Sequence, residues 1–63
     1  MDYHKVTKAD CLTVATPDVK ARLGVISDMD ILKSLATIWC AINGYKLGGY
    51  LGNDCWDATK KAG

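Results

Sequence analysis

The sequence contains few side chains from which an active site is built. Its single histidine, His4, lies near the start of the chain, where residues are usually too mobile to position a reacting group. A hydrolase or transferase needs a nucleophile, a base within hydrogen-bond reach and a group that stabilises developing negative charge. We therefore predict a protein that is not an enzyme, with no catalytic residue, no cofactor site and no metal site.

An excess of one charge is also missing. The chain has eight Lys and Arg residues and seven Asp residues, which gives a formal net charge of +1. Nucleic-acid binding then requires a local basic face rather than a global field. The lysines are scattered along the chain instead, at Lys5, Lys8, Lys20, Lys33, Lys46, Lys60 and Lys61. Nucleic acid is therefore a disfavoured partner.

The sequence has no long uninterrupted hydrophobic run. Its most apolar stretch, 31–51, contains Lys33, Asn43, Lys46 and several glycines, which a membrane-spanning helix tolerates poorly. The first residues also lack the basic region and apolar run of a signal peptide. We therefore expect no transmembrane segment and a cytoplasmic location.

Close cysteine spacing is absent as well. The chain has three cysteines, Cys11, Cys40 and Cys55, and they form no Cys-x-x-Cys motif. An odd number without close spacing does not indicate a disulfide framework. Reduced, buried thiols are the favoured interpretation. A Cys40–Cys55 bridge is one alternative. A metal site combining the thiols with His4 is another, although zinc ligands usually come in closely spaced pairs.

The length, 63 residues, allows a single domain over 1–63. A chain this short is at the lower limit at which one hydrophobic core stabilises a fold without disulfides, metal or partners. A second copy or another protein would bury the apolar surface that so small a body leaves exposed. The length therefore favours a homo-oligomer or a protein partner.

Capping signals predict two short helices in the first third of the chain. Thr7 and Asp10 have the spacing of a capping box, which opens the first helix. Thr16 is a good N-cap and Pro17 is tolerated at the first helical position. Gly24 then supplies the left-handed residue that commonly ends a helix.

The strongest helical pattern lies in the middle of the chain. Ser27 and Asp30 again fit a capping box, and Asn43 with Gly44 has the composition of a helix C-terminus. We therefore predict a central helix over about 28–42. Its buried face is expected to carry the apolar residues that recur at helical spacing, Ile31, Leu35, Ile38 and Ile42.

Glycines dominate the connection 44–52. We interpret it as an irregular or helical linker, because glycine-rich strands pair weakly. The alternative is a small hairpin that turns at Gly48 and Gly49. The sequence does not decide between the linker and the hairpin.

A last short helix is expected over 55–61, capped by Asn53 and Asp54 and anchored by Trp56. The fold class predicted is therefore all-α, a single bundle of three to four short helices around the central helix. The expected core consists of Leu12, Val14, Val19, Leu23, Ile31, Leu35, Ile38, Trp39, Ile42, Leu51 and Trp56.

One segment is similar to the start of a helix-turn-helix unit. The stretch 19–25 followed by Ser27 has the appropriate pattern, but its turn is one residue longer than usual and Lys20 replaces a small residue. Asp28 and Asp30 would face DNA phosphates at the start of the second helix, where they would be repelled. A DNA-binding regulator therefore remains an alternative.

A membrane-active, bacteriocin-like antimicrobial peptide is a second alternative. The small size, the glycine-rich segment and the tryptophans Trp39 and Trp56 are compatible with it. Binding to anionic membranes favours a strongly basic polar face, however, and this chain is nearly neutral. This alternative is therefore weaker than a protein-binding role.

Aromatic residues in the last third of the chain indicate the preferred function. Tyr and Trp are the residues that most often anchor protein interfaces. We predict that Tyr45, Tyr50 and Trp56 form a protein-binding surface next to the flexible glycines. The hypothesis is a small interaction protein, acting as a regulator, inhibitor or assembly subunit, that binds another protein or itself.

Overall fold

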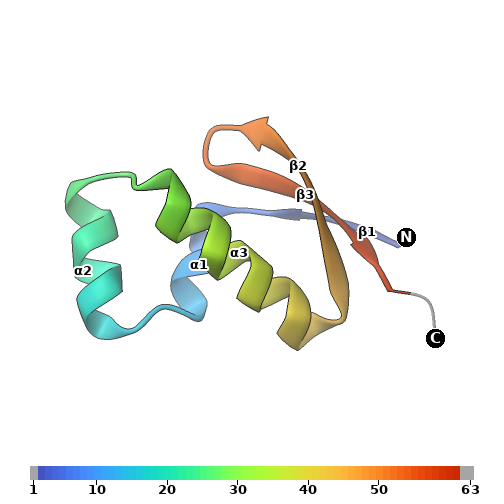
Figure 1. Ribbon diagram of the computed structural model, residues 1–63, viewed down its shortest axis with the longest axis horizontal. Helices are drawn as coiled ribbons and strands as arrows, with labels where there is room; N and C mark the ends of the chain where they lie inside the picture. The colour runs from blue at the N-terminus through green and yellow to red at the C-terminus, as the bar shows by residue number, and fades with distance from the viewer. Residues whose placement is uncertain (1, 62–63) are drawn as a thin grey trace.

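The computed structural model describes residues 2–61, which form a mixed α/β fold of two layers (Figure 1). The elements in chain order are β1 (Tyr3–Val6), α1 (Lys8–Thr13), α2 (Pro17–Val25), α3 (Met29–Asn43), β2 (Tyr45–Gly52) and β3 (Cys55–Lys60). The prediction of an all-α bundle is therefore wrong. Three helices are present, but the two ends of the chain form an antiparallel sheet that the sequence interpretation missed.

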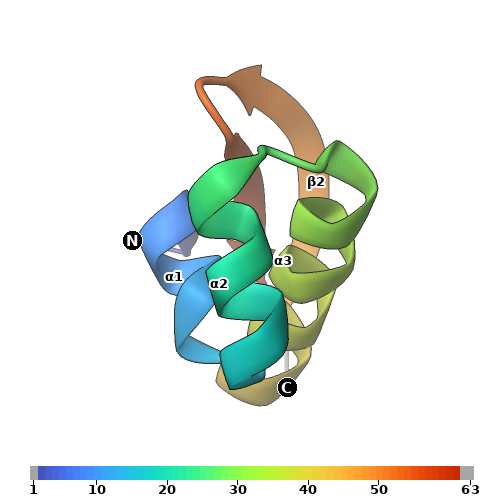
Figure 2. The ribbon, with the colours of Figure 1, turned by 90° about the vertical axis from the view of Figure 1, so that its left-hand side faces the viewer.

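The sheet joins segments that are far apart in the sequence. Its strand order is β1-β3-β2, so the last strand lies in the centre and pairs with both others in antiparallel orientation. Val6 of β1 and Tyr50 of β2 both pair with Trp56. In Figures 1 and 2 the three helices lie on one side of this sheet.

The segment predicted as the last helix is strand β3. Asn53 and Asp54 have φ angles of 53° and 59°, and two consecutive positive φ values are the requirement of a type I′ hairpin turn. These residues therefore turn the chain from β2 into β3 instead of capping a helix. Trp56 and Ala58 then fall on one face of the strand and are both buried, as alternation along a strand predicts. Cys55, on the other face, is buried as well.

The glycine-rich connection is a single strand, so neither the linker nor the hairpin turning at Gly48 and Gly49 is correct. β2 runs through both glycines, and its register with β3 shifts between Leu47 and Tyr50. This irregularity places both Leu47 and Tyr50 opposite buried residues of β3, Ala58 and Trp56. The glycines thus form a bulge in the strand rather than its end.

The predicted helix starts are largely confirmed. Both hydrogen bonds of the capping box between Thr7 and Asp10 are present, and the Thr16 hydroxyl accepts from the backbone N–H of Val19. α3 differs in one detail. Its N-cap is Asp28 rather than Ser27, because the Asp28 carboxylate accepts the backbone N–H groups that need a partner.

The two predicted helix ends have different outcomes. Gly44 ends α3 with φ 78°, as expected for a left-handed cap. Gly24 does not end α2, which continues to Val25 and is capped by Ile26 in an extended conformation. The difference arises because Gly24 keeps helical backbone angles, which glycine adopts as readily as left-handed ones.

The buried face of α3 is rotated from the predicted one. α3 packs against both α1 and β2, and its buried residues are Leu32, Leu35, Ala36 and Cys40. Small side chains such as Ala36 and Cys40 let neighbouring elements approach closely. As a result Ile38 and Ile42, which we expected in the core, lie at the exposed flank of the helix.

The rest of the predicted core is partly correct. Leu23, Leu35 and Trp56 are buried, whereas Leu51 is half exposed because it lies on the free edge strand β2. The remaining predicted residues are partly buried and pack against the core, namely Leu12, Val14, Val19, Ile31 and Trp39. Residues 2–61 contain no helix that is both long and apolar enough to cross a membrane.

Candidate functional site

Tyr50 is held in place at both ends of its side chain. Its ring lies against the indole of Trp56, with the ring centroids 5.0 Å apart and the planes inclined at 59°. Its hydroxyl accepts a hydrogen bond of 3.0 Å from the backbone N–H of Asp54. Half of Tyr50 nevertheless remains exposed. The hairpin therefore presents a fixed aromatic ring to its surroundings.

The β2–β3 hairpin itself creates this arrangement. The tight turn at Asn53 and Asp54 returns the chain so that the Asp54 N–H meets the hydroxyl of a residue four positions earlier. Trp56 is only 3% exposed and belongs to the core. Of the two predicted contact residues in the hairpin end, Trp56 is buried and Tyr50 is half exposed.

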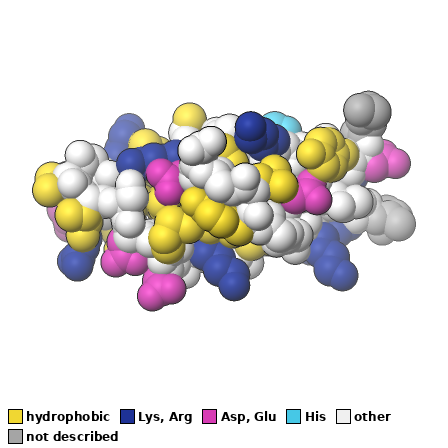
Figure 3. Space-filling view, turned by 90° about the horizontal axis from the view of Figure 1, so that it is seen from above, with side chains coloured by type: hydrophobic (Ala, Val, Ile, Leu, Met, Phe, Trp, Pro, Cys, Tyr) yellow, Lys and Arg dark blue, Asp and Glu magenta, His cyan; other side chains and the backbone are white. Residues whose placement is uncertain are grey.

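Other exposed apolar residues belong to segments that lie near the hairpin end. Figures 1 and 2 place the α2–α3 connection and the end of the β2–β3 hairpin on one side of α3. The exposed large apolar residues from these parts are Val25, Ile26, Met29, Tyr50 and Leu51, which we call the hairpin-end surface. Figure 3, seen from that side, shows hydrophobic side chains in several groups, one near the middle and others toward both ends, with charged side chains between them.

The chain exposes more large apolar side chains than it buries. Within residues 2–61 the large side chains of the core are Val6, Leu23, Leu32, Leu35 and Trp56, and the remaining core positions are cysteine or alanine. Eight large hydrophobic residues are exposed, including Ile38 and Ile42 in addition to the hairpin-end surface. Val25 is 85% exposed and Ile42 68%. Exposed apolar side chains are typical of interaction sites where they lie close together.

Tyr45, the third predicted contact residue, belongs to a separate aromatic cluster. Its ring stacks on Trp39 at 5.6 Å between centroids, and Trp39 stacks on His4 at 4.7 Å. The Lys60 ammonium lies 5.6 Å from the centre of the Tyr45 ring. Tyr45 is at the opposite end of β2 from Tyr50. The structure therefore does not bring Tyr45 together with Tyr50 and Trp56.

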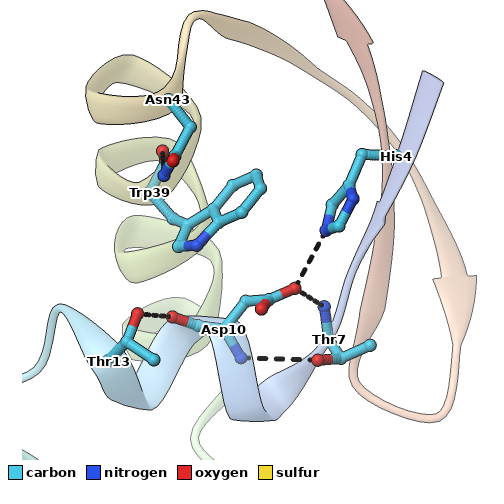
Figure 4. Close-up of polar contacts among 6 residues, drawn as sticks. All are labelled: His4, Thr7, Asp10, Thr13, Trp39 and Asn43. Atoms are coloured by element: carbon cyan, nitrogen blue, oxygen red, sulfur yellow. Dashed lines mark hydrogen bonds and ion pairs between the residues drawn. The ribbon is translucent and has the colours of Figure 1, made fainter. Parts of the chain in front are cut away.

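His4 connects this aromatic cluster to α1 (Figure 4). Its Nε2 lies 3.1 Å from Oδ2 of Asp10, and the same oxygen accepts the backbone N–H of Thr7. The carboxylate that orients the imidazole is therefore part of the capping box of α1. Within residues 2–61, no three His, Cys, Asp or Glu side chains are grouped so that they hold a metal ion. The His4–Asp10 pair thus joins β1 to α1.

The three cysteines are free and buried. Burial raises the pKa of the Cys11 thiol to about 11, and the nearby Asp10 carboxylate acts in the same direction. Burial also raises the pKa of Cys40. Because the thiolate is the reactive form, the Cys11 and Cys40 thiols stay protonated and unreactive at neutral pH.

The sequence interpretation missed most of the hairpin-end surface. Val25 or Ile26 was expected to pack back over the last turn of α2, but both are exposed. Met29 had no assigned role, and Leu51 was expected in the core. The signal that would have located the hairpin is the Asn53–Asp54 pair, since both residue types tolerate positive φ. Its resemblance to a helix cap concealed it, because Asn and Asp favour both positions.

Comparison with known proteins gives no relative on which a function can rest. No protein-family model matches this chain, and no curated protein or solved structure shows significant similarity to it. A function for the chain therefore rests on its own residues and their geometry.

Proposed function

We propose that this protein is a non-enzymatic protein-binding module and that the hairpin-end surface is its interface. The observation that supports this most strongly is the fixed, half-exposed ring of Tyr50, held by Trp56 beneath it and by the Asp54 N–H at its hydroxyl. An aromatic side chain that is already ordered loses little entropy when a partner covers it. Such residues are the typical anchors of interfaces.

The surroundings of Tyr50 favour a protein partner. Aliphatic side chains from α2, α3 and β2 are exposed, and the segments that carry them lie near one another on one side of α3. A core of aromatic and aliphatic groups within a polar rim is the usual composition of an interface. Burying Val25 and Leu51 together would contribute on the order of 3 kcal/mol at the usual value for a fully buried aliphatic side chain.

DNA binding through α2 and α3 is the weaker alternative. The start of α3 carries Asp28, whose carboxylate caps the helix, and Asp30, which is exposed. Both would approach phosphates in the usual docking of a helix-turn-helix unit, and phosphate contacts supply most of the baseline affinity for DNA. The apolar hairpin-end surface has no role in that arrangement.

Affinity capture with two matched variants tests the proposal. Leu51→Ser and Ile42→Ser each replace an exposed aliphatic residue with serine, the first on the hairpin-end surface and the second on the free flank of α3. The tagged wild-type chain and both variants are expressed in cells of the source organism, and the retained proteins are identified by mass spectrometry. Circular dichroism checks that both variants fold.

The expected result is a defined protein, either foreign or an untagged copy of this chain, that Ile42→Ser retains and Leu51→Ser loses. Truncation of one interface anchor usually costs about 1 kcal/mol or more, a loss of fivefold or more in affinity. Retention by both variants, or loss only with Ile42→Ser, would show that the interface is not the hairpin-end surface.

A further inference from the structure

We infer that the partner of the hairpin-end surface is a second copy of this chain, bound around a two-fold axis. The inference rests on the proposed function and adds the identity of the partner to it. It is carried by the charges that border the surface, which are of opposite sign on its two sides.

Within residues 2–61 the bordering charges have no ion-pair partner. Arg22 lies one turn before Val25 on α2, and Asp30 follows Met29 at the start of α3. Both are exposed, and in the part of the chain that the structure describes the ion pair between His4 and Asp10 is the only one. The surface therefore has a cation on its α2 side and an anion on its α3 side, both free to pair with another molecule.

A two-fold axis brings these opposite charges together. In a symmetric dimer the same surface meets itself, so a residue on one side faces the other side in the partner. Arg22 of each copy is then placed opposite Asp30 of the other, while Tyr50 and its aliphatic neighbours meet near the axis. Charge pairs of this kind fix the register of an interface and disfavour other partners.

The size of the surface fits a small dimer. A large side chain offers roughly 200 Å² when fully exposed, so these five residues, which are 40% to 85% exposed, present on the order of 500 Å² per copy. The polar rim, with Arg22 and Asp30, brings this close to the roughly 800 Å² per partner of a standard interface. Dimerisation would also cover apolar surface that the five large core residues of a single copy leave exposed.

Charge reversal on the purified full chain tests the inference. The variants are Arg22→Glu and Asp30→Lys, each alone and both combined, and sedimentation velocity measures the fraction of dimer. In a two-fold dimer of either single variant, both pairs between positions 22 and 30 consist of like charges. A mixture of the two single variants forms a heterodimer in which both pairs have opposite charges again. Lys46→Glu, an exposed residue at the opposite end of β2, is the control for the charge change itself.

The wild type and Lys46→Glu are expected to dimerise with a Kd below about 100 µM. Each single reversal should raise the Kd by about tenfold or more, and the mixture and the double variant should restore it. The melting temperature of each variant checks its fold. The inference would be overturned if neither single reversal raised the Kd of the dimer. It would also be overturned if the Kd of the mixture stayed as high as that of the single variants.

A wild type that remains monomeric at about 1 mM would also overturn the inference. It would leave the proposed function standing if affinity capture still retains a foreign protein that Leu51→Ser loses. Loss of both results would remove both proposals. The two experiments therefore separate an incorrect partner from an incorrect surface.

Discussion

Gly48 lies so close to Asp57 that a Cβ atom built on it would meet the Asp57 carbonyl oxygen at 3.0 Å. Backbone atoms of a central strand cannot move aside as the end of a flexible side chain does. A glycine at position 48 therefore allows β2 to pass this close to Asp57 at the bulge, and the register shift at the bulge places Tyr50 opposite Trp56. The geometry of the hairpin-end surface thus depends on a glycine at position 48.

Gly48→Ala should destabilise the protein, and Gly49→Ala is the matched control. A Cβ at position 49 would have no atom within 4 Å. We expect a loss of about 1 to 3 kcal/mol in the free energy of unfolding for Gly48→Ala, the usual cost of overpacking, and a change within about 0.5 kcal/mol for Gly49→Ala. Urea denaturation measures both, and equal effects would contradict the contact.

The second prediction concerns the orientation of α3. Leu32 is fully buried and Ile42 is 68% exposed, although the periodicity of the sequence suggested that Ile42 faces the core. Leu32→Ala should cost about 2 to 5 kcal/mol, enough to unfold a marginally stable domain. Ile42→Ala should change the free energy of unfolding of the monomer by only about 0.5 kcal/mol. Thermal denaturation would show the reverse order if the helix were rotated.

The third prediction is a loss of stability at alkaline pH. The Cys11 thiol has a pKa of 9.0 when exposed and about 11 in the fold, so unfolding favours the thiolate above pH 9. The free energy of unfolding should therefore fall between pH 9 and pH 11, by on the order of 2 kcal/mol. Cys11→Ala is the control, and it should be less stable at pH 7 but flatter between these pH values.

The helices could be predicted from the sequence because their signals are local. Thr7, Thr16 and Gly44 specify caps through atoms only a few residues away, and each of these assignments is correct. The face of α3 was harder, since two overlapping apolar stripes run along the helix. Which stripe is buried depends on where α1 and β2 pack, and neither position follows from the periodicity of α3.

The sheet could not be predicted because its information is non-local. β1 is only four residues long and pairs with β3, more than fifty positions away, so its pattern alone is too short to distinguish a strand from an irregular start. Asn53 and Asp54 suit both a helix cap and a tight turn. The pairing with β1 and β2 decides between them, and it also buries Trp56, which we predicted as a contact residue.

Photo-crosslinking in living cells tests whether the hairpin-end surface is the interface. A photoreactive amino acid replaces Leu51 in one variant and Lys46 in another, so that two exposed positions of the same strand are compared. We predict a discrete crosslinked product from position 51, with twice the mass of the chain, and none from position 46. A product from position 46 alone, or none from either position while the protein is abundant, would contradict an interface at Tyr50.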